Sequence, residues 1–200
     1  MAHPDDAELL CAGTLARAKA DGATIGICVL CRGDKGQPDL RIEDLAEARS
    51  SEMRAAAEVL EAELLEGGFS DGELLDGLTE RSKLTDLYRR FRPTLVLAHS
   101  VNDYHPDHRA ASALAESASW FCASKGHETE FTSMESPPAL WWMDTINMHG
   151  FLPGFYIDVE NFIELKRQMI RCHQSQLARG ESADFSPLEE LMIRQSEARG

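Results

Sequence analysis

The chain has 200 residues, 43% of them hydrophobic and 27% charged, which suits one well-packed domain and is short for two. The formal net charge is −14, and no cluster of Lys and Arg could neutralise a phosphate backbone, which argues against nucleic acid and anionic membrane as partners. No apolar run approaches the roughly 20 residues that span a bilayer, and the chain opens on a polar motif instead of a signal peptide, so we expect a cytoplasmic protein without a membrane span.

Helical and strand-like segments alternate along the first part of the chain. The periodicity of apolar residues predicts a helix over residues 8–20, which ends at Asp21-Gly22, and then a strand over 24–31. A polar loop over 32–39 leads into the most regular predicted helix, residues 42–60.

Arg49 interrupts the apolar stripe of the 42–60 helix. The other positions of that stripe are apolar: Ile42, Leu45, Met53, Ala56 and Leu60. A buried guanidinium is costly unless it meets a carboxylate, another acceptor or a water-filled cleft. We therefore expect Arg49 to point inward, either to a functional site or to a core carboxylate in a purely structural pair.

The alternation continues to the end of the chain. Ser124 to Pro138 is polar and ends in two prolines, so we expect an exposed excursion that could act as a lid. The other predicted elements are strands over 62–65, 94–98, 140–143 and 155–159, a turn over 69–72, and helices over 79–91, 107–123, 162–176 and 187–199. This order predicts a single α/β domain over residues 1–200, with a mostly parallel sheet covered by helices on both faces.

Two short motifs carry most of the functional signal, His3-Pro4-Asp5-Asp6 and His105-Pro106-Asp107-His108. In each, the Pro can take the first position of a helix, which places the acidic residues in the first turn and the His at the junction of loop and helix. A single Pro-Asp at a helix start is usually plain capping. Two copies favour a functional site, because loops at the carboxyl ends of strands are where open α/β sheets bind ligands.

The residue types of the two motifs indicate a metal site. A catalytic zinc needs about three protein ligands, commonly His and carboxylate, and an open position for water. His3, Asp6 and His108 supply such a set if the two loops converge. The same ligands would also suit a two-His-one-carboxylate iron centre for oxygen chemistry. A third alternative is a binding module that has lost its catalytic activity.

The remaining residues of the motifs can carry acid–base chemistry. Asp5 can take the proton of a water as general base, and His105 can stabilise an oxyanion or protonate a leaving group. Asp107 would most simply orient one of the imidazoles.

These motifs, with three further segments, resemble the PIG-L/LmbE-like N-acetylglucosaminyl deacetylases over nearly the whole chain. The further segments are Arg49 with Glu52, Phe69-Ser70-Asp71-Gly72 and Cys172-His173-Gln174-Ser175-Gln176. The resemblance implies a Rossmann-like three-layer fold and zinc-dependent removal of the acetyl group from a small molecule that contains N-acetylglucosamine. The Arg32-Gly33-x-x-Gly36 loop is similar to that of the branch that acts on bacillithiol or mycothiol precursors.

Site roles follow from the same resemblance. It implies zinc ligands at His3, Asp6 and His108, with Asp5 as general base. It also implies His105 as oxyanion stabiliser or acid, oriented by Asp107, and Arg49 near the substrate. A homo-oligomer is compatible with all of this, and the sequence names neither the aglycone nor the oligomeric state.

The chain also departs from the family pattern. Members normally carry an apolar strand before the first motif and a strand-bearing segment after a glycine like Gly200, so the chain looks trimmed at both ends. We therefore expect the loop with His3 to be weakly held. His173 is expected in the core or behind the site. His99, His127 and His149 are single histidines in predicted loops or at strand ends, and we expect His149 not to border the pocket.

Overall fold

The computed structural model describes residues 1–38, 41–177 and 187–199, so the last residue of the predicted 32–39 loop and Gly200 lie outside the described part. Its helices are α1 (Asp6–Leu10), α2 (Ala12–Ala20), α3 (Leu45–Leu60), α4 (Leu78–Phe91), α5 (Pro106–Phe121), α6 (Ile163–Ile170), α7 (Gln174–Leu177) and α8 (Leu188–Arg199), with a 3₁₀ turn, η1, at Glu160–Phe162. Its strands are β1 (Gly26–Cys31), β2 (Glu63–Phe69), β3 (Leu95–Ala98) and β4 (Ala139–Trp142).

The strands are parallel, as predicted, but they form two separate pairs. β1 pairs with β2, with Gly26 opposite Glu63, and β3 pairs with β4, with Leu95 opposite Ala139. Within the described residues, no ladder joins β1 to β3. The α/β class is therefore confirmed, and the sheet consists of two halves.

Three predicted elements differ from the structure. The helix predicted over 8–20 breaks at Cys11, where φ is −136°, and the helix predicted over 162–176 breaks between α6 and α7. The strand predicted over 155–159 is wrong, since this segment has no regular structure. Phe155 and Tyr156 are exposed, and the Phe155 ring meets Trp141 of β4 edge to face, with centroids 4.9 Å apart.

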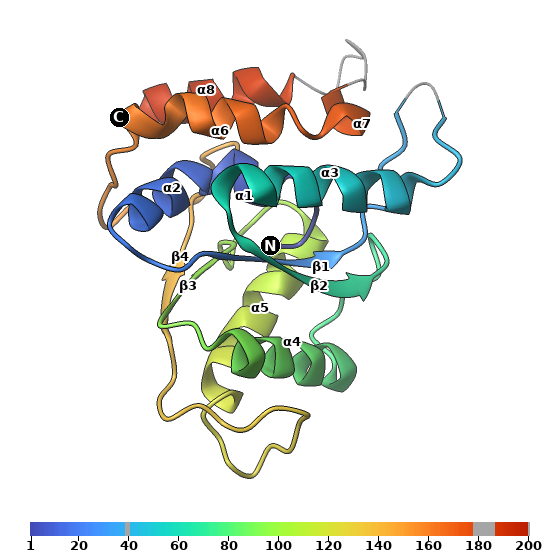
Figure 1. The fold of residues 1–200 in the computed structure, drawn as a ribbon, viewed down its shortest axis with the longest axis vertical. Coiled ribbons are helices and arrows are strands. Elements are labelled where there is room, and N and C mark those ends of the chain that lie inside the picture. The colour runs from blue at the N-terminus through green and yellow to red at the C-terminus, as the bar shows by residue number, and fades with distance from the viewer. Residues whose placement is uncertain (39–40, 178–186, 200) are drawn as a thin grey trace.

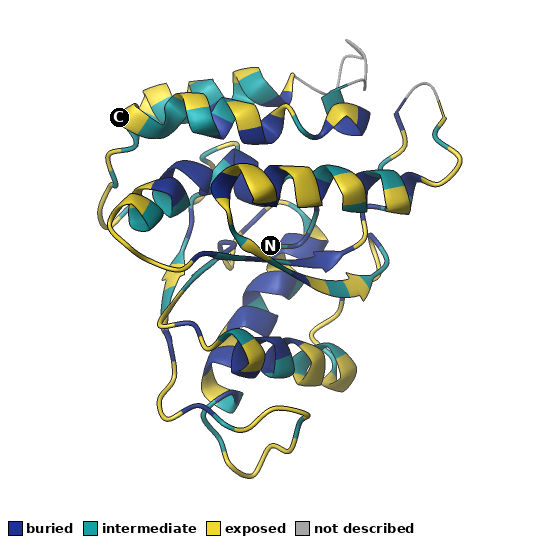
Figure 2. Cartoon of the chain, in the orientation of Figure 1, coloured by how far each residue is buried: buried dark blue, intermediate teal, exposed yellow. Residues whose placement is uncertain are grey.

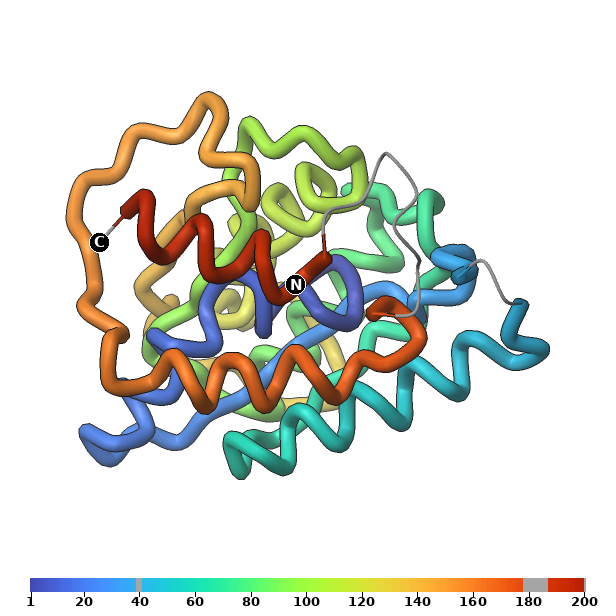
Figure 3. The backbone as a smooth tube through the Cα atoms, turned by 90° about the horizontal axis from the view of Figure 1, so that it is seen from above, coloured from blue at the N-terminus to red at the C-terminus, as the bar shows by residue number. Residues whose placement is uncertain are grey.

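Helices cover both faces of the strands. In Figure 1, α1, α2, α3, α6 and α8 lie on one side, and α4 and α5 lie on the other. Seen from above, α6 and α8 run side by side over the N-terminal segment (Figure 3). Three apolar clusters fill the layers. The first includes Met53, Leu60 and Met169, the second Leu114 and Leu84, and the third Ile170 and Met192. The buried residues of Figure 2 follow this arrangement along β1 and the inner face of α5.

The first two residues lie along β1 and lead into the first motif. The backbone N–H of Leu30 donates to Met1 O (3.0 Å), and that of Cys31 donates to Ala2 O (2.8 Å). His3 therefore emerges at the carboxyl end of β1, while β3 ends at Ala98, just before the loop that carries the second motif. None of the helices in the described part of the chain is long and apolar enough to cross a membrane.

Candidate metal centre

The two motifs meet, and three side chains converge on one point. His3 Nδ1 lies 3.3 Å from His108 Nε2 and 3.7 Å from Asp6 Oδ2, and His108 Nε2 lies 3.3 Å from Asp6 Oδ1. Asp6 and His108 are buried, and His3 is nearly so. Residues about a hundred positions apart in sequence thus place two ring nitrogens and a carboxylate within contact of one another.

The two motifs begin their helices differently. His105 caps α5 and Pro106 takes its first position, as the sequence predicts. Pro4, however, lies before α1, and Asp5 is the residue that precedes the helix, with the positive φ of 101°. The prediction of a Pro at the first helical position is therefore wrong for the first motif. Such left-handed backbone at a residue other than Gly is uncommon and concentrates at functional sites.

Each of the two converging imidazoles has its other ring nitrogen against a carboxylate. His3 Nε2 lies 2.9 Å from Asp107 Oδ2, and His108 Nδ1 lies 3.1 Å from Asp103 Oδ1. These carboxylates favour a proton on the nitrogen that they face, so the lone pairs of His3 Nδ1 and His108 Nε2 are directed at the common point. Carboxylates orient metal-bound histidines in this way.

The charges at the site are strongly coupled. Burial alone would raise the pKa of Asp6, but His108 and His99 hold it well below its ordinary value. Burial alone would lower the pKa of His108, but Asp6 and Asp103 raise it to about 10. The cluster is therefore a buried anionic site that draws positive charge to the position of His108.

Asp5 lies beside this cluster and is held by Arg49, as the apolar stripe of the helix predicts. Arg49 is 3% exposed, and its Nη2 donates to Asp5 Oδ2 at 3.0 Å and also to Pro4 O. Gly33 makes room for it, since a Cβ there would lie 2.5 Å from Arg49 Cδ. Burial raises the pKa of Asp5, and the nearby Arg49 limits the rise. Asp5 is thus a carboxylate with increased basicity and one oxygen, Oδ1, outside that ion pair.

His105 lies on the other side of the cluster, with its ring centroid 4.8 Å from that of His3. Its Nδ1 accepts the backbone N–H of Asp107 at 3.2 Å, so the ring proton of the neutral form lies on Nε2. Burial and the two neighbouring histidines lower the pKa of His105, which keeps the ring neutral at physiological pH. The contact expected between the Asp107 carboxylate and His105 is replaced by bonds to His3 and to the backbone N–H of Gly72, the latter at 2.7 Å.

Sequence reasoning missed two residues of the cluster, His99 and Asp103. His99 is 1% exposed, and its Nε2 lies 3.0 Å from Ala2 N and 3.2 Å from Asp6 Oδ2. Its ring stacks on that of His108 at 4.0 Å, and burial lowers its pKa to about 4. Their position in the sequence could have indicated a role in the site, because both residues follow the carboxyl end of β3.

A layer of polar contacts supports the site from the side of α6 and α7. His173 is fully buried, as expected, and its Nε2 lies 3.5 Å from Glu8 of α1. The next turn binds α3: the backbone N–H and the hydroxyl of Ser175 both donate to Glu52, each at 2.7 Å. The segment 173–176 thus contacts both α1, which directly follows Asp5, and α3, which carries Arg49.

Besides His3 with Asp6 and His108, the described residues offer three overlapping groups of His, Cys, Asp and Glu that could hold a metal. All lie in this cluster, and each contains a member of the two motifs. They are His3 with His105 and His108, His3 with Cys31 and Asp107, and Asp6 with His99 and His108. His127 and His149 belong to none of these groups.

The chain is similar to several known proteins. The family model described as PIG-L, GlcNAc-PI de-N-acetylase, matches residues 1–119. Diacetylchitobiose deacetylase of Thermococcus kodakarensis is 26% identical over a 181-residue alignment, and the match covers 87% of this chain and 67% of that protein. The solved structure of the conserved protein TT1542 from Thermus thermophilus is 33% identical, with a TM-score of 0.82 over 99% of this chain and 84% of that one.

A hydratase shares the same architecture. The structure of GalB, the 4-carboxy-2-hydroxymuconate hydratase from Pseudomonas putida KT2440, is 25% identical, with a TM-score of 0.84 over 100% of this chain and 83% of that one.

Proposed function

Because this chain belongs to the PIG-L, GlcNAc-PI de-N-acetylase, family, we propose that it is a zinc-dependent enzyme that hydrolyses the N-acetyl group of a small molecule containing N-acetylglucosamine. The observation that carries the proposal is the convergence of His3, Asp6 and His108 beside Asp5. The sugar is supported by the deacetylase relative, whose name places its activity on diacetylchitobiose.

The proposed zinc ligands are His3 Nδ1, an oxygen of Asp6, and His108 Nε2. Tetrahedral ligands at the usual zinc distances lie roughly 3.3–3.4 Å from one another. Here His3 Nδ1 lies 3.3 Å from His108 Nε2, and these two nitrogens lie 3.7 Å and 3.3 Å from different oxygens of Asp6, Oδ2 and Oδ1 respectively. The donor types and the orientation of both imidazoles by Asp107 and Asp103 also suit zinc.

The other possible groups are less suited. His99 Nε2 already accepts the backbone N–H of Ala2, so its lone pair is in use. Burial raises the pKa of Cys31 strongly, which disfavours the thiolate that a metal needs. His105 uses Nδ1 to cap α5 and carries its proton on Nε2.

The chain's own residues supply the rest of the chemistry. When bound, zinc supplies a Lewis acid that polarises the amide carbonyl. Asp5 accepts the proton of the attacking water at Oδ1, while Arg49 holds Oδ2 in place. The Nε2–H of His105 is a donor for the developing oxyanion and for the departing amine. Arg49 is the proposed arginine on the substrate side of Asp5, and its Nε has no hydrogen-bond partner within the described residues.

The test combines metal analysis with activity. Purified protein should contain one zinc per chain and release free amine from a panel of N-acetylglucosaminides, and chelator should abolish the release. Asp5→Asn should keep zinc and lose roughly 10²- to 10⁴-fold in rate. Asp21→Asn, an exposed carboxylate at the end of α2, is the matched control and should keep full activity.

The second candidate, a hydratase, rests on the similarity to GalB. The same preparation is therefore assayed for addition of water to an unsaturated dicarboxylic acid. Zinc with hydration and no amine release would replace the deacetylase proposal. Bound iron with oxygen uptake would identify an oxygenase, and zinc without turnover of any substrate would identify a binding protein.

A further inference from the structure

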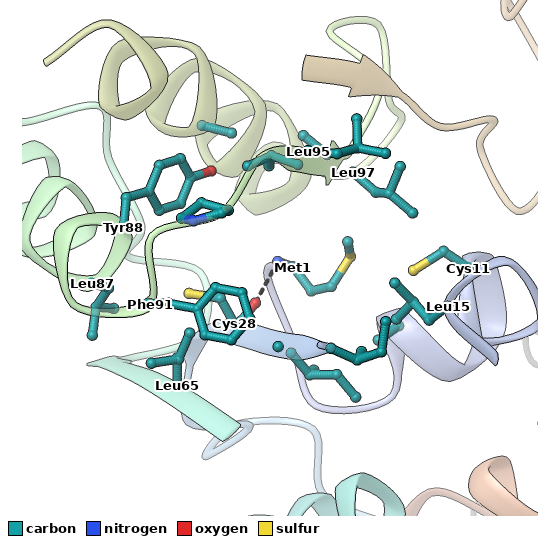
Figure 4. Close-up of a pocket in the computed structure, with 18 of the residues that line it drawn as sticks. Met1, Cys11, Leu15, Cys28, Leu65, Leu87, Tyr88, Phe91, Leu95 and Leu97 are labelled. Carbon is teal, nitrogen blue, oxygen red and sulfur yellow. Dashed lines mark hydrogen bonds between the residues drawn. The ribbon is translucent and has the colours of Figure 1, made fainter. Parts of the chain in front are cut away.

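The three tyrosines of the chain have different surroundings. Tyr88 of α4 is buried, and its ring lines the apolar cavity between β1 and β3 (Figure 4). Tyr156, which follows β4, is 63% exposed, and Tyr104, on the loop that links β3 to α5, is 57% exposed. Of the three, only Tyr104 has its ring against histidines of the metal cluster in the described part of the chain. Core packing therefore explains Tyr88 but not Tyr104.

The Tyr104 ring touches two imidazoles that the proposed chemistry uses. Its centroid lies 6.0 Å from that of His105, with the ring planes at 87°, and 5.8 Å from that of His108, with the planes at 64°. Edge-to-face contact covers far less of a ring than stacking does, so aromatic surface remains open beside the cluster. A molecule bound at the cluster therefore meets Tyr104.

The backbone that carries Tyr104 is held in place. Arg109 Nη1 donates to Asp103 O at 2.8 Å and to Tyr104 O at 2.9 Å. The backbone N–H of His105 donates to Asp103 Oδ1 at 3.0 Å. A ring on a fixed backbone loses little further freedom when a ligand packs on it, which favours binding.

The chemistry of the proposed substrate places a ring next to Tyr104. In an N-acetylglucosamine unit, the acetylated nitrogen is bonded directly to a carbon of the pyranose ring. His105 is the proposed donor to that nitrogen, so the pyranose ring lies beside His105 and within reach of Tyr104. The faces of a pyranose carry C–H groups, which pack well on the electron-rich face of an aromatic ring. An acyclic N-acetylated amine offers no such face.

We propose that the acetylated pyranose ring of the substrate stacks on Tyr104, and that this contact selects cyclic over acyclic N-acetylated amines. Tyr104 is thus a substrate-binding residue that takes no part in proton transfer. The aromatic ring makes the contact, so phenylalanine can replace tyrosine. This inference rests on the proposed function, because that function supplies the sugar.

The test measures binding separately from turnover. Methyl N-acetyl-β-glucosaminide is titrated, with NMR detection, into zinc-loaded chains that carry Asp5→Asn. Adding Tyr104→Ala should weaken binding roughly tenfold, the size of one good aromatic contact, whereas Tyr104→Phe should bind as tightly as tyrosine. Tyr156→Ala, at the other exposed tyrosine, is the matched control and should change nothing.

Three results would overturn the proposal. The first is equal affinity in Tyr104→Ala and Tyr156→Ala, which includes the case in which the glycoside does not bind. The second is a Tyr104→Phe variant as weak as Tyr104→Ala. The third is an equal loss of affinity for N-acetylethanolamine, an acyclic amide, because that loss would not depend on a sugar ring.

Zinc content separates stacking from damage to the cluster. It should stay at one per chain in Tyr104→Ala, because the tyrosine holds no ligand in place. If it falls, Tyr104→Leu decides, since leucine keeps bulk without an aromatic face. Weak glycoside binding by Tyr104→Leu with zinc retained supports the proposal, and any other result with that variant overturns it.

Release of free amine by chains that keep Asp5 separates this inference from the proposed reaction. Binding that depends on Tyr104 without amine release would refute the reaction and leave the stacking contact. Amine release with the same KM in Tyr104→Ala and Tyr156→Ala would refute the stacking contact and leave the reaction. A KM about tenfold higher in Tyr104→Ala only, with little change in kcat, supports both.

Discussion

Asp103→Asn tests whether the Asp103 carboxylate supports His108 as a proposed zinc ligand. Asp103 is 3% exposed, and its Oδ1 faces His108 Nδ1 at 3.1 Å. Asparagine keeps an acceptor for that N–H and removes the charge that makes the imidazole more basic. Loss of such a supporting carboxylate typically lowers metal affinity roughly 10- to 100-fold. At about 1.4 kcal/mol per tenfold, this corresponds to about 1.4–2.8 kcal/mol of zinc binding energy.

The assay is a competition titration of zinc against a chelator of known affinity, at fixed pH. Asp144→Asn is the matched control, because Asp144 also pairs through one oxygen, with Arg199 Nε at 2.7 Å, in another part of the molecule. The control should bind zinc as tightly as the unsubstituted chain. Unchanged affinity in Asp103→Asn would refute the assignment of His108 Nε2 as a zinc ligand oriented by Asp103, and an equal loss in both variants would show a general effect on folding.

Three further substitutions test the packing around the site. Burial lowers the pKa of Lys166 from 10.5 to about 8, so the charged Lys166 side chain destabilises the fold by up to about 3 kcal/mol at neutral pH. Lys166→Met should therefore raise the free energy of unfolding. This gain should shrink between pH 8 and 10.5, because the unfolded chain binds more protons than the folded chain in that range. Glu52→Gln removes the charge that receives two bonds from α7 and should lower the free energy of unfolding by about 1–3 kcal/mol in urea titrations, whereas the exposed Glu58→Gln on the same helix should change it little. Leu114→Ala empties a fully buried position of α5 and should lower that energy by about 2–5 kcal/mol, and a loss under about 1 kcal/mol would contradict the core described above.

Local sequence signals predicted the elements that depend on local contacts. Pro106 at the start of α5 and the apolar stripe of α3 both depend on residues within a few turns. The prediction of a strand over 155–159 is wrong because a strand needs a neighbouring strand to pair with, and the composition of a segment does not show whether such a neighbour exists. The division of the sheet depends on contacts between distant segments, which periodicity does not encode.

The candidate site also has parts that the sequence predicts and parts that depend on contacts between distant segments. The paired His-Pro-Asp motifs predicted which residues converge, because repetition of a rare pattern is visible in sequence. His99 and Asp103 form no pattern with their neighbours, and only the end of β3 brings them to His108. The partner of Asp107 was also beyond sequence reasoning, since His3 and His105 lie on either side of it and only side-chain geometry selects His3.

The two motifs start alike and reach different backbone conformations, and Arg49 explains the difference. A left-handed Asp costs roughly 1–2 kcal/mol relative to ordinary helical backbone. At Asp5 this cost is offset by the charge-assisted bonds that Arg49 gives to the Asp5 carboxylate and to Pro4 O, each of which contributes about 1.5–3 kcal/mol. His105, the residue that caps α5, instead has extended backbone, with φ −85° and ψ 133°, and its ring accepts the backbone N–H of Asp107. The arginine therefore fixes the conformation of the proposed base as well as its charge, so the position of Asp5 depends on α3 as much as on the motif itself.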